Sequence, residues 1–158
     1  INLVNCHLSR TNLNYVNLKG SNLNSADISN AFLIETNLEN TRLNQTNLEN
    51  SNLNQALLMG AYASGANFKD AYLIKAQLQN AFLIKTDFSN AFLMEADLTG
   101  CYLTGADFEN ASLYKADLRG AKGLAIEQLT KAKTLCLAKF DEDILEQIKS
   151  DIPELVGK

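Results

Sequence analysis

Several residue types are scarce in this sequence. Among its 158 residues there are no tryptophans, one proline, one histidine and three cysteines. A single histidine leaves little material for a nucleophile that is paired with a base. No apolar run approaches the roughly 18 to 20 residues that a membrane span needs. The net charge is only −4, so no basic surface is available to bind nucleic acid or an anionic membrane.

What the sequence has in abundance is a five-residue repeat. From Leu3 to Leu118 every fifth residue is apolar, which makes 24 consecutive centres, 19 of them leucine. The residue two positions before the centre is small in 22 of these 24 units. The other three positions of each unit are mostly polar.

A period of five fits neither a helix nor a straight strand. On an α-helix five residues advance by about 500°, so successive leucines would cover every side. On a straight strand an odd period would place them alternately on both faces. The pattern is satisfied if the chain runs extended for about three residues, turns a corner and repeats, with the centre and the small residue pointing inward. The sequence therefore predicts a solenoid.

The repeating units resemble a known family. Ala96–Gly100, Ala106–Asn110 and Ala116–Gly120 are similar to the A-(D/N)-L-x-x unit of pentapeptide repeat proteins, and the resemblance covers residues 1 to about 122. It implies an all-β solenoid, namely a right-handed, four-sided β-helix with 20 residues in each coil. About six such coils, stacked about 4.8 Å apart, would form a rod roughly 29 Å long. The position before each centre supports the 20-residue coil, because it departs from Asp or Asn mainly in two rows spaced by 20 residues.

The tail leaves the repeat after Gly120. We expect a short helix over 126–134 and a second helix that begins after Asp141, carries Ile144, Leu145 and Ile148, and ends near Pro153. This tail resembles the helical caps of bacterial, cyanobacterial-type pentapeptide repeat proteins. We therefore divide the chain into a β-helix, residues 1–121, and a C-terminal α-helical cap, residues 122–158, which covers the last coil.

The first coil has no such cap in the sequence. It exposes Ile1, Leu3, Leu8 and Val16 together with an open backbone edge. We expect this end either to follow a segment that has been lost or to be buried against another molecule.

Four groups of residues are candidates for chemical sites. His7 lies at an outward position, where a solvated surface residue is favoured over a member of a Ser-His-Asp or Cys-His arrangement. Gly60–Gly65 lacks the Lys-Ser/Thr of a phosphate loop. Asp141–Asp143 suits a helix N-terminus better than a cation site. Aspartates stacked one coil apart suit hydrogen bonding at the corners better than acid–base catalysis. We therefore expect no enzyme, no catalytic residue, no metal site, no cofactor and no small-molecule substrate.

The cysteines bear on the cellular compartment. Cys6 and Cys101 occupy inward positions where a small residue is required, and Cys136 lies in the cap. A disulfide between Cys101 and Cys136 would indicate an oxidising compartment, and three free thiols would indicate a reducing one. No signal peptide is visible, which favours the cytoplasm. Because the chain starts at Ile1, a removed leader stays open, with the periplasm or thylakoid lumen as the alternatives.

The main departure from the polar pattern is a set of apolar residues at outward positions. They form a candidate interaction surface that consists of Phe32, Ile34, Tyr72, Ile74, Phe92, Met94 and Tyr114 on one face and Tyr62, Phe82, Ile84 and Tyr102 on the opposite face. Outward rings would stack from coil to coil and stabilise the ladder. A patch of a few hundred Å² is also large enough for a binding site. Both interpretations stay open at the level of the sequence.

These observations predict a non-enzymatic interaction module whose flat, rigid faces bind a protein partner or a second copy. The family resemblance adds an alternative, because some members bind DNA topoisomerases such as gyrase by imitating the size and charge of duplex DNA. Residues 1–120 carry 11 acidic and eight basic side chains. Duplex DNA of the same length carries about 17 charges, so the sequence favours the first prediction.

Overall fold

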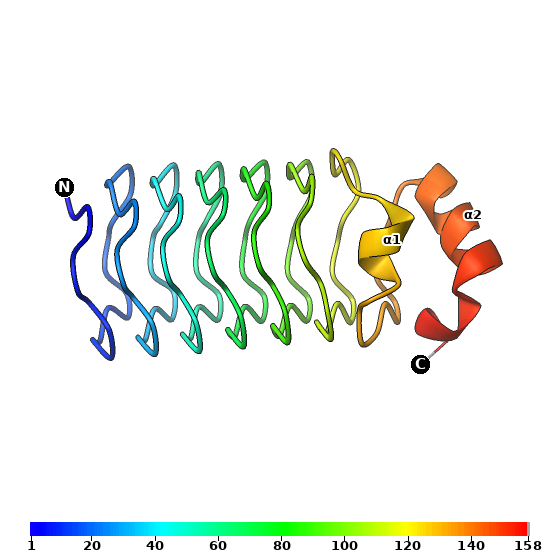
Figure 1. Cartoon of the computed structure of the whole chain (residues 1–158), viewed down its shortest axis with the longest axis horizontal. Helices are drawn as coiled ribbons and strands as arrows, with labels where there is room; N and C mark the ends of the chain where they lie inside the picture. Colours follow the sequence, from blue (N-terminus) through cyan, green and yellow to red (C-terminus); the bar gives the residue numbers. More distant parts are fainter. Residues whose placement is uncertain (158) are drawn as a thin grey trace.

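The protein is a rod of stacked coils with helices at its C-terminal end (Figure 1). The computed structural model describes residues 1–157. Each extended segment is short and forms a parallel bridge with the segment 20 residues later, beginning with Asn2 and Asn22. The helices are α1 (Ile126–Leu129), α2 (Glu142–Asp151) and the 3₁₀ helix η1 (Pro153–Leu155).

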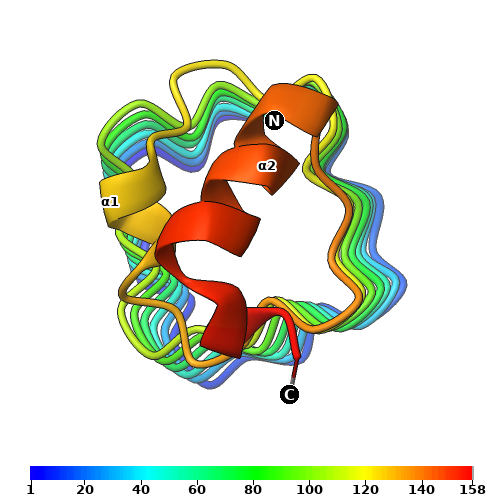
Figure 2. The ribbon, with the colours of Figure 1, turned by 90° about the vertical axis from the view of Figure 1, so that its right-hand side faces the viewer.

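Viewed along the rod, the coil has four sides (Figure 2). We number the faces by the units of the first coil, so that residues 1–5 begin face 1, 6–10 face 2, 11–15 face 3 and 16–20 face 4. Every later unit lies above its equivalent 20 residues earlier. Coil 4 therefore comprises residues 61–80, and coil 5 comprises residues 81–100.

Backbone hydrogen bonds explain both the stacking and the corners. Leu23 donates its N–H to the carbonyl of Arg42 over 2.7 Å, and Arg42 donates in turn to Ser21 over 2.9 Å. At the corner, Ala26 donates to Leu23, and Ser25 between them has a φ of 58°. The last residue of every unit has such a positive φ, which Gly and Asn adopt at low cost.

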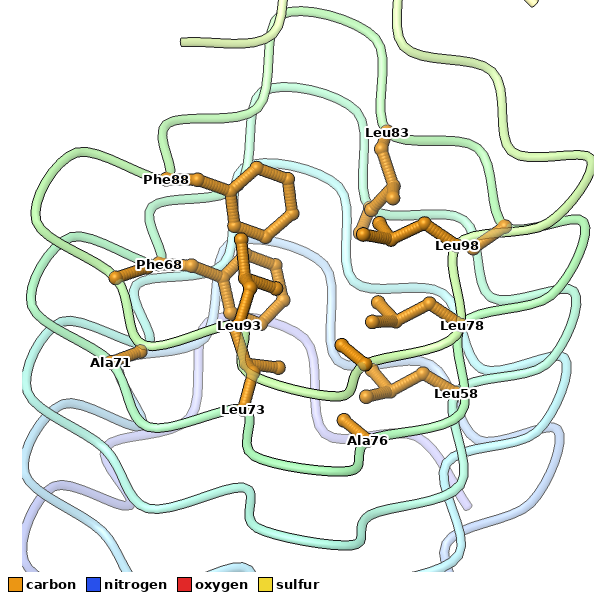
Figure 3. Close-up of a cluster of buried hydrophobic side chains, with 14 of the residues drawn as sticks. Leu58, Phe68, Ala71, Leu73, Ala76, Leu78, Leu83, Phe88, Leu93 and Leu98 are labelled. Carbon is orange, nitrogen blue, oxygen red and sulfur yellow. The ribbon is translucent and has the colours of Figure 1, made fainter. Parts of the chain in front are cut away.

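The interior consists of columns of identical or similar side chains. Leu58, Leu78 and Leu98 form one column, and Phe68 and Phe88 lie in another (Figure 3). From Leu23 to Leu113 the centres are fully buried. Threonines at the small inward position are also satisfied, since the Oγ1 of Thr46 donates to the carbonyl of Leu23 over 2.7 Å. The small inward position therefore accepts Thr as well as Ala, because the buried threonine hydroxyl finds a carbonyl acceptor.

The ladder continues past the predicted boundary at residue 121. Lys122 pairs with Tyr102, Thr134 with Ser112, and Lys139 with Asp117, so the tail completes most of a seventh turn. In Figure 2, α1 lies in the wall of this turn, whereas α2 crosses the open end. The division into residues 1–121 and 122–158 as separate units stays a prediction.

The tail helices follow the expectation in part. The expected helix over 126–134 is wrong in length, because α1 ends at Leu129. The chain must then turn back so that Lys133 can donate its N–H to Ala111 over 2.9 Å. Helix α2 starts directly after Asp141, as expected, and buries Ile148. The Asp141 carboxylate accepts from the N–H of Gly120 over 2.9 Å, which ties the cap to the last regular coil.

A coupled pair in the core provides a test of packing. Ala63 is fully buried in a column that otherwise holds leucine, and we interpret the adjacent Phe68 as filling the volume that the missing side chain leaves. Ala63→Leu should overpack the site and cost about 1–3 kcal/mol, and Phe68→Leu should open a void. The double variant should lose less stability than the sum of the single variants in a urea titration.

The matched control combines Ala63→Leu with Phe88→Leu, because coil 5 already holds Leu83 beside Phe88. We expect this second pair to show a smaller coupling energy. Additive losses in both double variants would contradict the idea that Phe68 compensates for Ala63.

Candidate interaction surface

The ladders place the outward apolar residues on two opposite faces. Phe32, Ile34, Tyr72, Ile74, Phe92, Met94 and Tyr114 lie on face 3, and Tyr62, Phe82, Ile84 and Tyr102 lie on face 1. On face 3, Asn52 and Asn54 separate Phe32 from the later rings. The contiguous part therefore consists of Tyr72, Ile74, Phe92 and Met94, which we call the face-3 patch, with Tyr114 one coil further along.

Face 1 holds a single file of stacked rings. Tyr62 and Phe82 have centroids 4.9 Å apart, and Phe82 and Tyr102 have centroids 4.7 Å apart. The file ends at Lys122, whose Nζ lies 4.4 Å from the centroid of the Tyr102 ring and donates to its hydroxyl over 2.9 Å. Phe82 therefore has a ring on both sides, Tyr102 has a ring on one side and a cation on the other, and Tyr62 at the start of the file is 44% exposed.

Face 3 has a different form, since two apolar columns run side by side. Tyr72 and Phe92 stack with centroids 4.8 Å apart. The second column carries Ile74 and Met94 on the same two coils. Tyr72 is 42% exposed, and the other three side chains are half-buried. The face-3 patch is thus a compact block across coils 4 and 5.

An aromatic residue at the outward position before a centre removes a hydrogen bond that Asp or Asn makes there in other units. Where the outward residue is Asp, its carboxylate accepts from the backbone N–H two residues later, as Asp87 does from Ser89 over 2.8 Å. Phe82, Phe92 and Tyr102 have no such acceptor. Each therefore gives up a turn bond of roughly 1 kcal/mol, which stacking or an interface must offset.

The aspartate rows take part in these turn bonds, in agreement with the interpretation from the sequence. Asp27, Asp97 and Asp107 accept the same bond as Asp87. For Asp27, hydrogen bonds from Ser29 hold the pKa below its usual value. Among residues 1–157, no cluster of three or more His, Cys, Asp or Glu side chains is placed to hold a metal ion. None of the helices described is long and apolar enough to cross a membrane.

The charges are distributed unevenly over the four faces. Between residues 6 and 110, face 2 carries six acidic side chains, namely Asp27, Glu49, Asp70, Asp87, Asp107 and Glu109, against two basic ones, Arg10 and Lys69. Face 3 is balanced, and its charges alternate along the corner column in the order Glu35, Gln55, Lys75, Glu95 and Lys115. Lys75 and Glu95 lie 3.7 Å apart as an exposed ion pair.

The alternating corner column was missed by reasoning from the sequence, which considered only the positions on either side of each centre. Its signal was available, because Lys75, Glu95 and Lys115 recur at intervals of 20 residues. In the structure Lys75 and Glu95 border the face-3 patch on the same two coils, and Lys115 lies one coil further along.

Two shallow hollows flank face 3. A hollow of about 370 Å³ lies at the corner with face 4 and is lined by Glu35, Gln55, Leu57, Lys75 and Gln77. A hollow of about 310 Å³ lies at the corner with face 2 and is lined by Asn90, Ala91, Phe92, Asn110, Ser112 and Lys133. The two borders of face 3 are therefore concave, and a partner's side chains could fit into them.

The cysteines do not form the bridge that the sequence suggested. Cys6, Cys101 and Cys136 are free thiols in the structure. Cys101 points into the core and donates to the carbonyl of Leu78 over 2.9 Å, whereas Cys136 follows Tyr114 on the outward side of face 3. Burial raises the pKa of Cys101 to about 12, so its thiol is protonated at neutral pH and is a poor nucleophile.

The repeat was compared with known protein families. The family described as pentapeptide repeats matches this chain in eight copies, over residues 1–40, 36–73, 51–90 and 91–122. The chain belongs to the pentapeptide repeat family. No curated protein matches it.

Solved structures of pentapeptide repeat proteins are similar to this chain. HetL from the cyanobacterium Nostoc sp. strain PCC 7120, described as involved in heterocyst differentiation regulation, is 29% identical, with 87% of this chain and 71% of HetL covered and a TM-score of 0.44. Rfr23 from the cyanobacterium Cyanothece 51142 is 22% identical, with 89% and 88% covered and a TM-score of 0.53. QnrB1, a plasmid-mediated fluoroquinolone resistance protein, is 17% identical, with 92% and 84% covered and a TM-score of 0.51.

The last two likenesses concern the fold. They confirm the predicted right-handed, four-sided β-helix of pentapeptide repeat proteins. The family membership likewise confirms a repeat protein of solenoid type.

An ion pair at the end of the regular coils provides a test by pH. The Arg119 guanidinium donates two hydrogen bonds to the Asp117 carboxylate and, together with Lys139, lowers the pKa of Asp117. A lowered pKa adds stability above the unfolded value near 3.9, and this stability is lost as the pH falls through the folded value. Asp117→Asn should therefore reduce the free energy of unfolding at pH 7 and flatten its decline below pH about 4.

Denaturant titrations at several pH values measure this effect. The control is Glu146→Gln, which removes an exposed carboxylate on α2. Identical pH dependence in Asp117→Asn and the wild type would contradict the assignment.

Proposed function

We propose that this pentapeptide repeat protein is a non-enzymatic interaction module that binds a protein partner or a second copy through the face-3 patch. The observation that carries the proposal is the block of Tyr72, Ile74, Phe92 and Met94, two apolar columns wide, at positions where the repeat otherwise places polar residues. Phe92 gives up the turn bond that Asp makes elsewhere, so the block is not the default of the fold.

Face 3 suits a binding role better than face 1. On face 1 the positions beside the ring file hold Ser64, Ile84 and Thr104, so no second apolar column runs along it. That file is explained by stacking along the ladder alone. On face 3 the apolar block is bordered by charges of both signs and by two hollows, which is the pattern of an apolar centre with a polar rim.

A comparison of the two faces tests the proposal. The face-3 variant carries Tyr72→Asn, Ile74→Thr, Phe92→Asn and Met94→Thr, and the control on face 1 carries Tyr62→Asn, Phe82→Asn and Tyr102→Asn. Both should stay folded, because the inward leucines are unchanged and each lost stacking pair, worth about 0.2–1 kcal/mol, is offset by a turn bond of roughly 1 kcal/mol that Asn can restore. Only the face-3 variant should lose self-association in sedimentation or capture of its partner from the native host.

The stability of each variant is measured by thermal unfolding in the same buffer. If association and capture by the face-3 variant remain those of the wild type, the outward rings are stacking ladders and the proposal fails.

A second candidate function rests on the acidic character of face 2. Its six carboxylates and two cations form the one strongly charged face of residues 1–120. A DNA topoisomerase such as gyrase binds duplex DNA, which an acidic rod can imitate. The net charge of this face is −4, about one quarter of the 17 or so charges on duplex DNA of this length, so this candidate is the weaker one. The likeness to QnrB1 concerns the fold alone.

Supercoiling by purified gyrase tests the second candidate. If it holds, the protein inhibits supercoiling, and a variant with Asp27→Asn, Asp87→Asn and Asp107→Asn loses the inhibition, because Asn preserves the turn bond and removes the charge. The face-3 variant should inhibit as the wild type does. No inhibition by the wild type would exclude the candidate.

A further inference from the structure

We infer that the face-3 patch binds a second copy of this chain, with the two rods antiparallel about a twofold axis that runs along the strands of face 3, between coils 4 and 5. The inference rests on the proposed function and names its partner. It follows from the order of charges and apolar residues along face 3, which is complementary to itself in this arrangement and in this register.

The corner charges set the direction. A twofold axis along the strands keeps each column opposite the same column of the partner and reverses the order of the coils. With the axis between coils 4 and 5, Lys75 lies opposite Glu95 of the second copy, and Glu95 lies opposite its Lys75. Together with the ion pair within each chain, 3.7 Å between Nζ and Oε2, this makes an alternating cluster of four charges.

The apolar residues match in the same arrangement. Coil 4 of one copy faces coil 5 of the other, so Tyr72 lies opposite Phe92, and Ile74 opposite Met94. Coils 3 and 6 then bring Gln55 opposite Lys115, Asn52 opposite Ser112 and Asn54 opposite Tyr114. The contact therefore has an aromatic and aliphatic centre surrounded by polar groups, as stable interfaces do.

Other registers are less favourable. An axis through coil 4 would place Lys75 opposite its own equivalent, and an axis through coil 5 would do the same to Glu95. An axis between coils 5 and 6 would pair Glu95 with Lys115, but it would place Phe92 opposite Ser112. Only the axis between coils 4 and 5 satisfies the corner charges and the apolar block together.

The contact area indicates a weak dimer. The patch spans few coils, at about 4.8 Å each, and is smaller than the roughly 800 Å² that each partner buries in a standard interface. We therefore expect a concentration-dependent dimer with a dissociation constant in the micromolar range or above, detectable by sedimentation between about 10 µM and 1 mM.

Charge reversal at the corner tests the geometry. Lys75→Glu alone creates two contacts between like charges in the dimer, and Glu95→Lys alone does the same, so each should weaken self-association about tenfold at low salt. A mixture of the two chains should form a heterodimer, because each altered residue then meets its opposite charge. The intrachain pair is lost equally in the separate and mixed samples, so mixing isolates the contact between chains.

The control is Lys115→Glu, which changes the same column and the same net charge one coil away. Mixed with the Glu95→Lys chain, it should give no heterodimer that is tighter than both homodimers. Lys115 lies opposite Gln55, and the one Glu95–Lys75 contact that this heterodimer keeps is offset by a contact between Lys75 and the introduced lysine. Both side chains of the altered pair are exposed, 58% for Lys75 and 45% for Glu95, so the variants should fold, and circular dichroism checks this.

Each outcome decides the inference. A heterodimer of the Lys75→Glu and Glu95→Lys chains that is tighter than both of their homodimers, without such a preference in the control mixture, supports it. A preferred heterodimer in the control mixture instead, a wild-type dimer that Lys75→Glu leaves unchanged, or a wild type that stays monomeric up to about 1 mM overturns it. A monomeric wild type whose partner capture is lost in the face-3 variant overturns this inference and leaves the proposed function standing.

Discussion

The backbone ladder between coils is the constraint on which the rest of the structure depends. Each extended segment donates to and accepts from segments 20 residues away, so every side chain lies directly above its equivalent in the preceding coil. Equivalent positions are therefore neighbours at the spacing of paired strands. At this spacing aromatic rings stack, as Tyr72 and Phe92 do, and side-chain amides hydrogen-bond between coils, as Asn67 and Asn47 do. Opposite charges at equivalent positions form ion pairs, as Lys75 and Glu95 do.

The ladder also determines where function can arise. Inward positions are filled by leucine, phenylalanine and small residues, and even Cys101 is held there as a protonated thiol that is bonded to a carbonyl. Outward positions lie on flat faces with shallow hollows at their corners. A fold of this kind can bind a partner only through its outer faces. Binding therefore depends on how the side chains of the four faces differ. Face 2 concentrates acidic charge, face 1 a file of rings, and face 3 an apolar block between alternating charges.

The face-3 patch shows how a repeat acquires a specific surface. Asp or Asn before each centre is favoured locally because it satisfies a corner N–H. Phe92 gives up that bond, and its ring gains a stacking partner in Tyr72, beside Ile74 and Met94. One coil of polar residues, with Asn52 and Asn54, separates the patch from Phe32. The surface therefore has a defined extent along the rod, which a uniform repeat would lack.

The five-residue period, the 20-residue coil and the inward columns could be predicted from the sequence, because each depends on a local pattern that every unit repeats. The start of α2 after Asp141 could be predicted as well, because an acidic residue before an apolar-periodic segment is a local signal for a helix N-terminus. The sequence also assigned the apolar residues to opposite faces. The tertiary structure alone decided the rest. Helix α1 ends at Leu129 because Lys133 must reach the carbonyl of Ala111, and Cys136 lies on an outward column away from Cys101 because the tail follows the coil through a seventh turn. These outcomes depend on where the last regular coil presents its donors and acceptors, and that is a long-range property which no pentapeptide encodes.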